Sequence, residues 1–326
     1  MSATIIAIVH LTSYGFLHPG RERFKRVTKE AWPLIPGSTL YGAVAAALMR
    51  LDCHKEKAEL EACAACQQSC GYRALLAEVQ AQRLRFSPLV VTSRQDKEDN
   101  FYTAQDYSHD AAHAATRLAV SPRAPLNRDT AAIHQDRLHG LVVHQPWQHY
   151  RGFICCTAAF LQEHLKRALL ALPFFPFGGG RGKFTQVEAA VIREYPDPAE
   201  FCPPRPVRRL ALLTPAILAK PQLGDLFGGM TCEVANFLLR RYTFWRTGLY
   251  WEEDAAGLKE YGGSDIKDHL TLARVGLAET AALHFPDPDP NKLQQLFLHG
   301  LGAADFTCLG WGQVFFQEQM PWIVTR

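Results

Sequence analysis

The sequence twice places a glycine-rich segment between a helix-like run and a strand-like run. The first segment, "FPFGGGRGKFTQVE", spans residues 175–188, and the second, "GLGAADFTCLGWG", spans residues 300–312. Glycine has no side chain, so it tolerates positive φ and leaves backbone N–H groups uncovered. Both segments, called here the first and second glycine arcs, are therefore suited to a tight turn from a helix into a strand. The repeated order predicts two similarly built halves.

The elements expected in the first half follow the order of a ferredoxin-like fold, β-α-β, long loop, β-α-β. Strand-like runs lie at 5–11, 83–91, 149–160 and 183–192, and helical runs at 39–51, 72–82 and 161–172. We predict an α+β protein with two ferredoxin-like (RRM-like) domains in tandem, at 1–195 and 205–326, joined by a proline-rich linker around 193–206. The first domain would contain a long loop at about 94–146. In the second, Asp289-Pro290 predicts the start of a helix.

Composition excludes several classes of protein. Hydrophobic residues make up 48% of the 326 residues and charged residues 21%, which is typical of globular chains. The formal net charge is only +3, so any binding of nucleic acid must depend on local basic patches. The first residues lack the pattern of a secretory signal, and no stretch has the length of a membrane-spanning helix. We therefore expect a cytoplasmic protein without membrane contact.

The first glycine arc does not fit two known nucleotide-binding motifs. A P-loop would need glycine at Phe177 and Ser or Thr at Phe184, and the dinucleotide fingerprint would need glycine at Lys183. A concavity of backbone amides beside two cations still suits phosphates, and an RNA backbone supplies them in series. The alternative is a tight connection that needs glycine only for its geometry. The candidates for RNA contact are Gly178, Gly179, Gly180, Arg181, Gly182 and Lys183.

The second glycine arc carries Asp305 and no cation, so geometry alone is as good an explanation for it as RNA contact. Elsewhere, the segment 237–251 interleaves cations with aromatic residues, which suits RNA, although a strand with a buried aromatic face is the favoured interpretation. The cations at 21–29 lie in a predicted loop and fit either RNA contact or a solvated surface. Ser38 is expected to cap a helix whose N-terminus also attracts phosphate. These segments add as RNA-contact candidates Ser38, Arg240, Arg241 and Arg246.

Four cysteines between residues 53 and 70 form a C-x9-C-x2-C-x3-C array. A C-x2-C turn is a common half-site for tetrahedral zinc, and two further thiolates complete the four ligands of a closed, structural site. His54 is a possible substitute for one of them. The alternative is a helical insert in which the cysteines are incidental. We predict a structural Zn²⁺ bound by Cys53, Cys63, Cys66 and Cys70.

Several stretches resemble the CRISPR-associated RAMP superfamily. "IPGSTLYGAVAAAL" is similar to the motif that opens its first helix, and residues 125–154 are similar to its Asn/Arg-containing loop and the strand that follows. "FLHGLGAADFTCLGWGQV" resembles its closing glycine motif, with Trp311 in place of the usual phenylalanine. Two halves of this kind look most like the subunit that caps the 5′ handle of the CRISPR RNA (crRNA) in type III or type III-derived effector complexes.

The resemblance implies a non-catalytic RNA-binding subunit. Its partners would be crRNA, the CRISPR backbone subunit, and a large or nuclease subunit. The loop motif adds Arg128 and Arg137 to the residues expected to contact RNA. Related proteins often carry zinc inserts, which agrees with the cysteine array.

Two enzymatic alternatives remain. Some RAMP relatives cut precursor guide RNA without a metal, with histidine or another base activating the 2′-hydroxyl, and the histidines near the long loop are His134, His139, His144 and His149. His109 and His113 have an i, i+4 spacing that also suits a metal. The pattern gives none of them a fixed catalytic partner, so a metal-independent endoribonuclease is the second interpretation. A metabolic enzyme that binds a phosphorylated small molecule at the first arc is less favoured, because the motif spacings fail.

Overall fold

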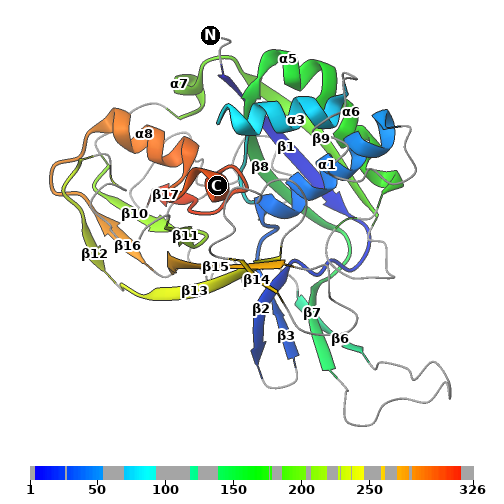
Figure 1. Cartoon of the computed structure of the whole chain (residues 1–326), viewed down its shortest axis with the longest axis horizontal. Coiled ribbons are helices and arrows are strands. Elements are labelled where there is room, and N and C mark those ends of the chain that lie inside the picture. The colour runs from blue at the N-terminus through cyan, green and yellow to red at the C-terminus, as the bar shows by residue number, and fades with distance from the viewer. Residues whose placement is uncertain are drawn as a thin grey trace.

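Figure 1 shows the computed structural model of the chain, in which two α+β halves lie side by side and a further group of strands extends from them. The structure describes residues 4–25, 28–53, 70–92, 118–123, 139–175, 177, 186–202, 207–218, 227, 229–235, 237–245, 258–260, 270–278 and 281–316. Within these ranges the side chains of residues 20–30, 120–141, 240–275, 305 and 316 are outside the description.

The N-terminal half is built on one antiparallel sheet. Its strands are β1 (Thr4–Ser13), β4 (Arg85–Phe86), β5 (Val90–Thr92), β8 (Gln148–Thr157) and β9 (Val187–Tyr195). The order across the sheet is β4-β8-β1-β9, and β5 also pairs with β8. With β4 and β5 counted as one interrupted strand, the second, third, first and fourth strands of the unit lie side by side. This arrangement is consistent with the predicted ferredoxin-like unit.

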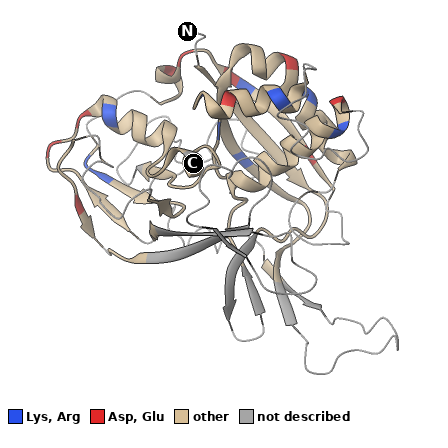
Figure 2. Cartoon of the chain, viewed as in Figure 1, with Lys and Arg blue, Asp and Glu red and all other residues tan. Residues whose placement is uncertain are grey.

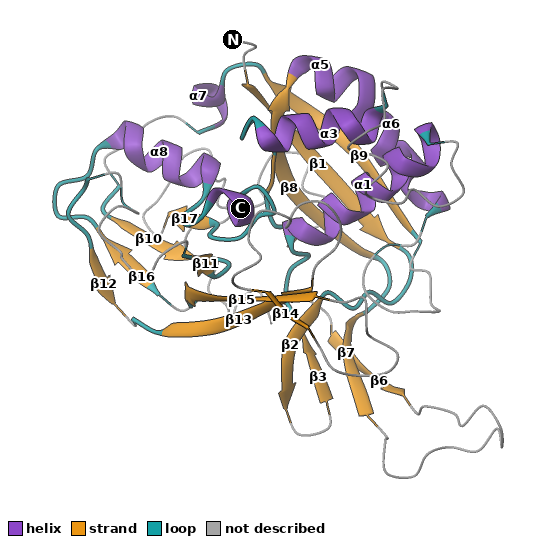
Figure 3. Ribbon diagram, viewed as in Figure 1, coloured by secondary structure: helices purple, strands orange, loops and turns teal. Residues whose placement is uncertain are grey.

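Helices cover one face of this sheet (Figure 3). They are α1 (Gly37–Asp52), α3 (Gly71–Gln80) and a continuous helical segment made of α5 (Ala158–Phe160), the π-helical η2 (Leu161–Leu165), α6 (Lys166–Ala171) and the 3₁₀ turn η3 (Leu172–Phe174). Alternate residues of a strand point to opposite faces. The β1 side chains buried beneath the helices are those of Ile5, Ala7, Val9 and Leu11.

The C-terminal half covers part of the opposite face. Ile6, Ile8 and Phe153 point away from the helices and belong to a core shared with residues after position 200. The ring of Phe153 lies 5.3 Å from that of Phe201 and 5.6 Å from that of Phe297, measured between centroids. Burying a side chain of this size contributes about 1.5–3 kcal/mol. The predicted linker is thus part of the joint, because Phe201 lies in the short helix α7 (Pro198–Phe201).

The C-terminal half contains two antiparallel sheets. One has the order β12 (Glu233–Ala235), β16 (Ala282–His284), β10 (Arg209–Leu212) and β17 (Val314–Phe316). The other has the order β11 (Ala216–Ile217), β15 (Leu270–Leu277) and β13 (Leu239–Trp245), and β14 (Leu258–Glu260) also pairs with β15. Helix α8 (Pro290–His299) begins as predicted, because the Asp289 carboxylate accepts hydrogen bonds from the backbone N–H groups of Asn291 and Lys292.

A fourth sheet lies where the sequence predicts loops. It has the order β2 (Gly20–Lys25), β3 (Thr28–Ala31), β7 (His139–His144) and β6 (Leu118–Arg123). β3 and β7 pair in parallel, and the other two pairs are antiparallel. The expectation of loops at 21–29 and across 94–146 is therefore wrong for these residues. The strands were missed because their sequences do not alternate clearly and because the pairing of β3 with β7, which joins the two hairpins, links Thr28 to Gly140, far along the chain.

Candidate nucleic-acid interface

The second glycine arc is a joint between the two halves. Four of its glycines, Gly300, Gly302, Gly310 and Gly312, have positive φ. A Cβ on Gly312 would lie 1.8 Å from the Leu301 carbonyl oxygen, so the arc closes on itself. Its amides are also used within the protein: Leu301 N–H donates to Gly312 O, Ala303 N–H to Ile217 O and Gly312 N–H to Pro215 O, each at 2.8 Å. This hydrogen bonding favours the structural interpretation of the second arc over RNA contact.

Arg85 attaches the second arc to the N-terminal sheet. Its side chain is 3% exposed. Its guanidinium donates to the carbonyl oxygens of Thr307 and Phe297, at 3.1 and 3.0 Å, and to Gln313 Oε1 at 2.7 Å. These acceptors lie in and around the arc. Because Arg85 is buried and bonded to them, its role is structural.

Helix α1 starts where the second arc meets the N-terminal half. The helix begins at Gly37 and its N-cap residue is Pro36. Among the described residues, no side chain forms a capping hydrogen bond at the N-terminus of this helix. The prediction that Ser38 caps the helix is therefore wrong. A cap must precede the helical turn, and Ser38 lies inside it. Gly37 occupies the start instead, packed so closely that a Cβ would lie 2.2 Å from the Phe86 carbonyl oxygen.

The first glycine arc lies largely outside the described residues, which here include only Phe177 and the chain from Gln186 onward. Phe177 is 2% exposed. At the other end of the arc, the Gln186 carbonyl accepts a hydrogen bond from Tyr14 N–H at 3.0 Å, and Val187 pairs with Ser13. The arc therefore joins β9 beside the end of β1.

Exposed aromatic rings lie at this end of β1. Trp147, in the turn between β7 and β8, is 65% exposed, and Phe16 is 59% exposed. The Tyr14 ring meets the Trp147 ring edge-on with centroids 5.0 Å apart, and the Tyr14 hydroxyl donates to Glu188 Oε2 at 2.5 Å. Trp147 has φ +61. For a residue with a Cβ this left-handed conformation costs roughly 1–2 kcal/mol, and residues held in it are concentrated at functional sites.

A polar cluster precedes the aromatic rings on the sheet face that the helices do not cover. The antiparallel register places His10 opposite Arg151 and Thr12 opposite His149. Thr12 Oγ1 lies 3.0 Å from His149 Nδ1 and 3.4 Å from His10 Nε2, and the two imidazole rings stack at 5.4 Å. Arg151 Nε donates to His10 Nδ1 at 3.5 Å. Burial, followed by the charge of Arg151 and by His149, lowers the pKa of His10 from 6.5 to about 4, so this ring is neutral at pH 7.

Sequence reasoning missed most of this surface. It did not single out Tyr14, Trp147 or His10, and it noted His149 only as one of several histidines near a loop. The available signal was polar residues two apart on each strand, His10 and Thr12 on β1 and His149 and Arg151 on β8. His144, noted in the same group, is fully buried and lies within hydrogen-bonding distance of the Tyr150 hydroxyl and the Trp32 carbonyl, so its role is structural.

The remaining predicted RNA contacts are not brought together by the described residues. Arg240 and Arg241 are in β13, but their side chains are not described. Ser38 is half-buried in the first turn of α1. The residues that lie outside the described part are Arg128, Arg137, Gly178, Gly179, Gly180, Arg181, Gly182, Lys183 and Arg246.

Two of the four predicted zinc ligands are described. Cys53 follows α1 and Cys70 precedes α3, both with free thiols, while Cys63 and Cys66 lie outside the described residues. Asp52 Oδ2 accepts the Gly71 N–H at 2.6 Å, which joins the residues next to both cysteines. Within the described ranges, no group of three or more His, Cys, Asp or Glu side chains is placed to hold a metal ion. The zinc site therefore stays a prediction.

The helical layer offers little to a polyanion. Two cations of α6 are paired, Arg167 with Asp52 and Lys166 with Glu194, both at 2.6 Å, and just after α3 a third, Arg83, is paired with Glu78 at 2.9 Å. Figure 2 shows charges of both signs interspersed over this layer. The three paired cations are therefore partly neutralised by neighbouring carboxylates.

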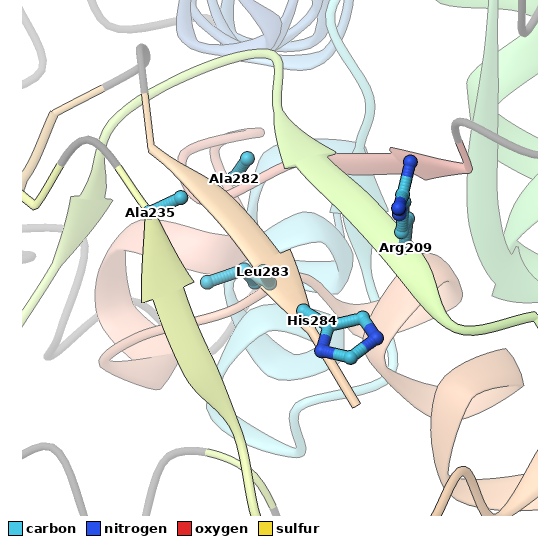
Figure 4. Close-up of a pocket in the computed structure, with 5 residues that line it drawn as sticks. All are labelled: Arg209, Ala235, Ala282, Leu283 and His284. Carbon is cyan, nitrogen blue, oxygen red and sulfur yellow. The ribbon is translucent and has the colours of Figure 1, made fainter. Parts of the chain in front are cut away.

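A pocket lies on the first sheet of the C-terminal half (Figure 4). It has a volume of about 340 Å³ and is lined by Arg209, Ala235, Ala282, Leu283 and His284. His284 Nδ1 is 3.2 Å from Glu233 Oε2, so its imidazole already has a carboxylate neighbour. The other lining is mostly aliphatic, which favours an apolar contact over catalysis. None of the helices in the described part of the chain combines the length and apolarity needed to cross a membrane.

Comparison with known proteins gives structural similarity alone. No family model and no curated protein sequence matches this chain. Similar solved structures include a chain of the type III-B Cmr-beta complex bound to cognate target RNA, at TM-score 0.41 and 8% identity, covering 91% of this chain and 96% of that chain. A CRISPR-associated protein Cas6 is similar at TM-score 0.36 and 10% identity, covering 97% and 100%. A Cas6 product complex is similar at TM-score 0.35 and 12% identity, covering 96% and 99%.

Proposed function

We propose that this chain is a non-catalytic RNA-binding subunit of a CRISPR effector ribonucleoprotein. It caps the repeat-derived 5′ handle of the crRNA, contacts the backbone subunit and a large or nuclease subunit, and acts in the cytoplasm. The motif resemblance described above supplies the class of complex. The observation that carries RNA binding is the junction of Gln186 with Tyr14, where the first glycine arc meets exposed aromatic rings.

Single-stranded RNA needs two kinds of surface, and we infer that the sequence of the arc supplies one and the exposed rings near Gln186 supply the other. Backbone amides and cations, here those of Arg181 and Lys183 in the arc, bind phosphates, while aromatic rings accept stacked bases. On the helical layer, by contrast, Arg167 is paired with Asp52. The proposed path of the RNA therefore runs past the end of β1 and the start of β9, away from the helices.

A structural zinc fits this function as a support for the insert between α1 and α3. The Asp52–Gly71 hydrogen bond closes the base of the insert, so Cys53 and Cys70 start from neighbouring positions. Together with Cys63 and Cys66 they would give four thiolate ligands and no open position. Zinc would stabilise the insert and would take no part in chemistry.

RNA binding is tested with the full-length chain and a labelled single-stranded RNA of the repeat-handle sequence. Four contacted phosphates would weaken affinity about 50-fold between 50 and 200 mM salt, because each contributes about 0.7 to the logarithmic slope. Replacing both Arg181 and Lys183 with alanine should lower the slope, whereas Arg167→Ala on the helical layer should not. Intact RNA after prolonged incubation is expected. Failure of the wild-type chain to bind any single-stranded RNA at low salt would refute the proposal.

The His10–His149–Arg151 cluster supports a second candidate, a metal-independent endoribonuclease. In such a reaction a neutral imidazole removes the 2′-hydroxyl proton, the 2′-oxygen attacks phosphorus, and the 5′-oxygen leaves with a proton from an acid. The products would be a 2′,3′-cyclic phosphate and a 5′-hydroxyl. We place this second because Arg151 is only 5% exposed and the lowered pKa of His10 makes it a weak base. Cyclic-phosphate product formed in EDTA and lost in His149→Ala would reverse the order of the two candidates.

A further inference from the structure

Trp147 is held in a fixed position while most of its ring remains exposed. Its backbone N–H donates to the Ser13 carbonyl at 2.7 Å, which fastens the turn to the end of β1. Within the turn, Gln148 Nε2 donates to the Gln145 carbonyl at 2.9 Å, and Gln145 Nε2 donates to the Leu118 carbonyl at 3.3 Å. The indole nevertheless remains 65% exposed. A core residue would bury this ring, and a mobile loop residue would not have these bonds.

The same turn holds Trp147 in the left-handed backbone region, which a bulky residue rarely adopts. The residues around it fix that geometry, since His144 and Tyr150 on either side of the turn are both fully buried. The Tyr14 ring contacts the indole edge-on and limits its rotation. A ring already fixed in place loses little conformational entropy when it binds a ligand.

The chemistry beside the ring favours a base over a phosphate. The Tyr14 hydroxyl donates to the Glu188 carboxylate, which places a negative charge on this side of the junction. A carboxylate repels phosphate but accepts hydrogen bonds from the amino groups of bases. In the proposed function, phosphates are bound instead by the amides and cations of the first glycine arc, whose chain continues into β9 at Val187.

We propose that Trp147 is a stacking platform for one unpaired base of the RNA, next to the nucleotides whose phosphates the first glycine arc binds. This rests on the proposed RNA-binding function and adds to it a specific residue and the part of the nucleotide that it recognises. Every base has an aromatic face, so the platform accepts any base in an unpaired strand.

The test compares three variants of the full-length chain by fluorescence anisotropy with the repeat-handle RNA. Stacking on an aromatic ring contributes about 1–3 kcal/mol per base, so Trp147→Ala should weaken binding about 5- to 150-fold. Trp147→Phe retains an aromatic face and should stay within about threefold of the wild type. The control is Phe237→Ala, which removes another exposed aromatic ring, 49% exposed, from the C-terminal half. Its affinity should not change.

A set of RNAs with one abasic position each supplies the ligand side of the test. One abasic position should weaken wild-type binding as much as Trp147→Ala does, and should have no further effect on that variant, because coupled groups are not additive. Comparable binding by Trp147→Phe and the wild type shows that the turn is folded.

The outcomes separate this inference from the function on which it rests. If the wild type binds RNA and Trp147→Ala binds equally well, the platform is wrong and the proposed function stands. If the wild type binds no RNA, the function itself fails. If Trp147→Ala keeps its RNA affinity but loses a co-purifying protein subunit, the exposed ring is a protein contact and the inference is overturned.

Discussion

Gly310 in the second glycine arc lies directly against Gly37 at the start of α1. A Cβ on Gly310 would be 3.1 Å from the Gly37 Cα and 2.4 Å from the Phe86 carbonyl oxygen, and one on Gly37 would be 2.7 Å from the Leu309 carbonyl oxygen. The two motifs that suggested a family from sequence, at opposite ends of the chain, are thus in contact. Their glycines permit the two halves to approach backbone to backbone.

The first prediction concerns this contact. Gly37→Ala and Gly310→Ala should each destabilise the protein by about 2 kcal/mol or more, because the neighbouring atoms are backbone and cannot move aside cheaply. The matched control is Gly42→Ala in the same helix α1, where an added Cβ meets nothing within 4 Å. There alanine should stabilise by about 0.5–1 kcal/mol. Urea unfolding followed by circular dichroism measures all three, and equal effects of Gly37→Ala and Gly42→Ala would contradict the packing argument.

The second prediction concerns Arg85. Arg85→Met removes three hydrogen bonds in the joint. The carbonyl oxygens of Thr307 and Phe297 keep other donors, Gly310 N–H and Gln313 Nε2, but Gln313 Oε1 loses its donor, so the variant should destabilise by about 1–3 kcal/mol. The control is Lys166→Met, whose side chain is 37% exposed and pairs with that of Glu194, which is 33% exposed. A surface pair of this kind is worth about 0–1 kcal/mol. If the two variants unfold at the same urea concentration, Arg85 does not stabilise the joint.

The third prediction is a pH dependence of stability. Burial lowers the pKa of His10 to about 4, and burial, followed by the charge of Arg85, lowers the pKa of His299. Below pH 6.5 His10 becomes protonated in the unfolded chain, whereas in the folded chain it stays neutral until the pH approaches 4. The folded state should therefore lose stability as the pH falls from 6.5 towards 4. His10→Gln should reduce the loss between pH 7 and pH 5. An unchanged loss would assign the acid sensitivity to other groups.

The fourth prediction concerns zinc. We expect about one zinc per purified chain by elemental analysis, because four thiolates complete one tetrahedral site. Cys53→Ser and Cys70→Ser should lower the zinc content and the melting temperature, and a strong chelator should do the same to the wild type. Cys232→Ser, which changes another partly exposed free thiol, should retain the metal. A metal-free wild-type protein that is unaffected by chelation would rule out the zinc insert.

Local sequence signals identified those parts of the fold whose causes are local. Helix α8 begins at a capping Asp289 followed by proline, as its sequence indicates. Apolar runs predicted β1 and β8, and leucines at helical spacing predicted a helix over 161–172, which lies within the helical segment from Ala158 to Phe174. Residues 158–160 were expected to be strand and are helical. The failed cap at Ser38 shows the limit of such signals, because the start of α1 is fixed by contacts with residues far along the chain.

The candidate site could be predicted only in part, because its geometry comes from pairing between distant strands. A glycine arc beside cations is visible in the sequence, but the register that places His10 opposite Arg151 is not. Nor does any local pattern show that Trp147 is fastened to Ser13, 134 positions earlier, while its ring remains exposed. Patterns in a single sequence indicate which faces of a helix or strand are apolar. Hydrogen bonds between residues so far apart in the chain produce no periodic pattern in the sequence.

The amino-acid sequence by itself determined the order of strands and helices in the ferredoxin-like unit of the first half, the cap of α8 and the positions of both glycine arcs, because these depend on neighbouring residues. Only the tertiary structure decided that the second arc is a joint held by Arg85, that β2, β3, β6 and β7 form a sheet, and that aromatic rings lie where the first arc enters β9. The physical reason is that backbone conformation is chosen locally, whereas burial and strand register are chosen by contacts between residues far apart in the chain.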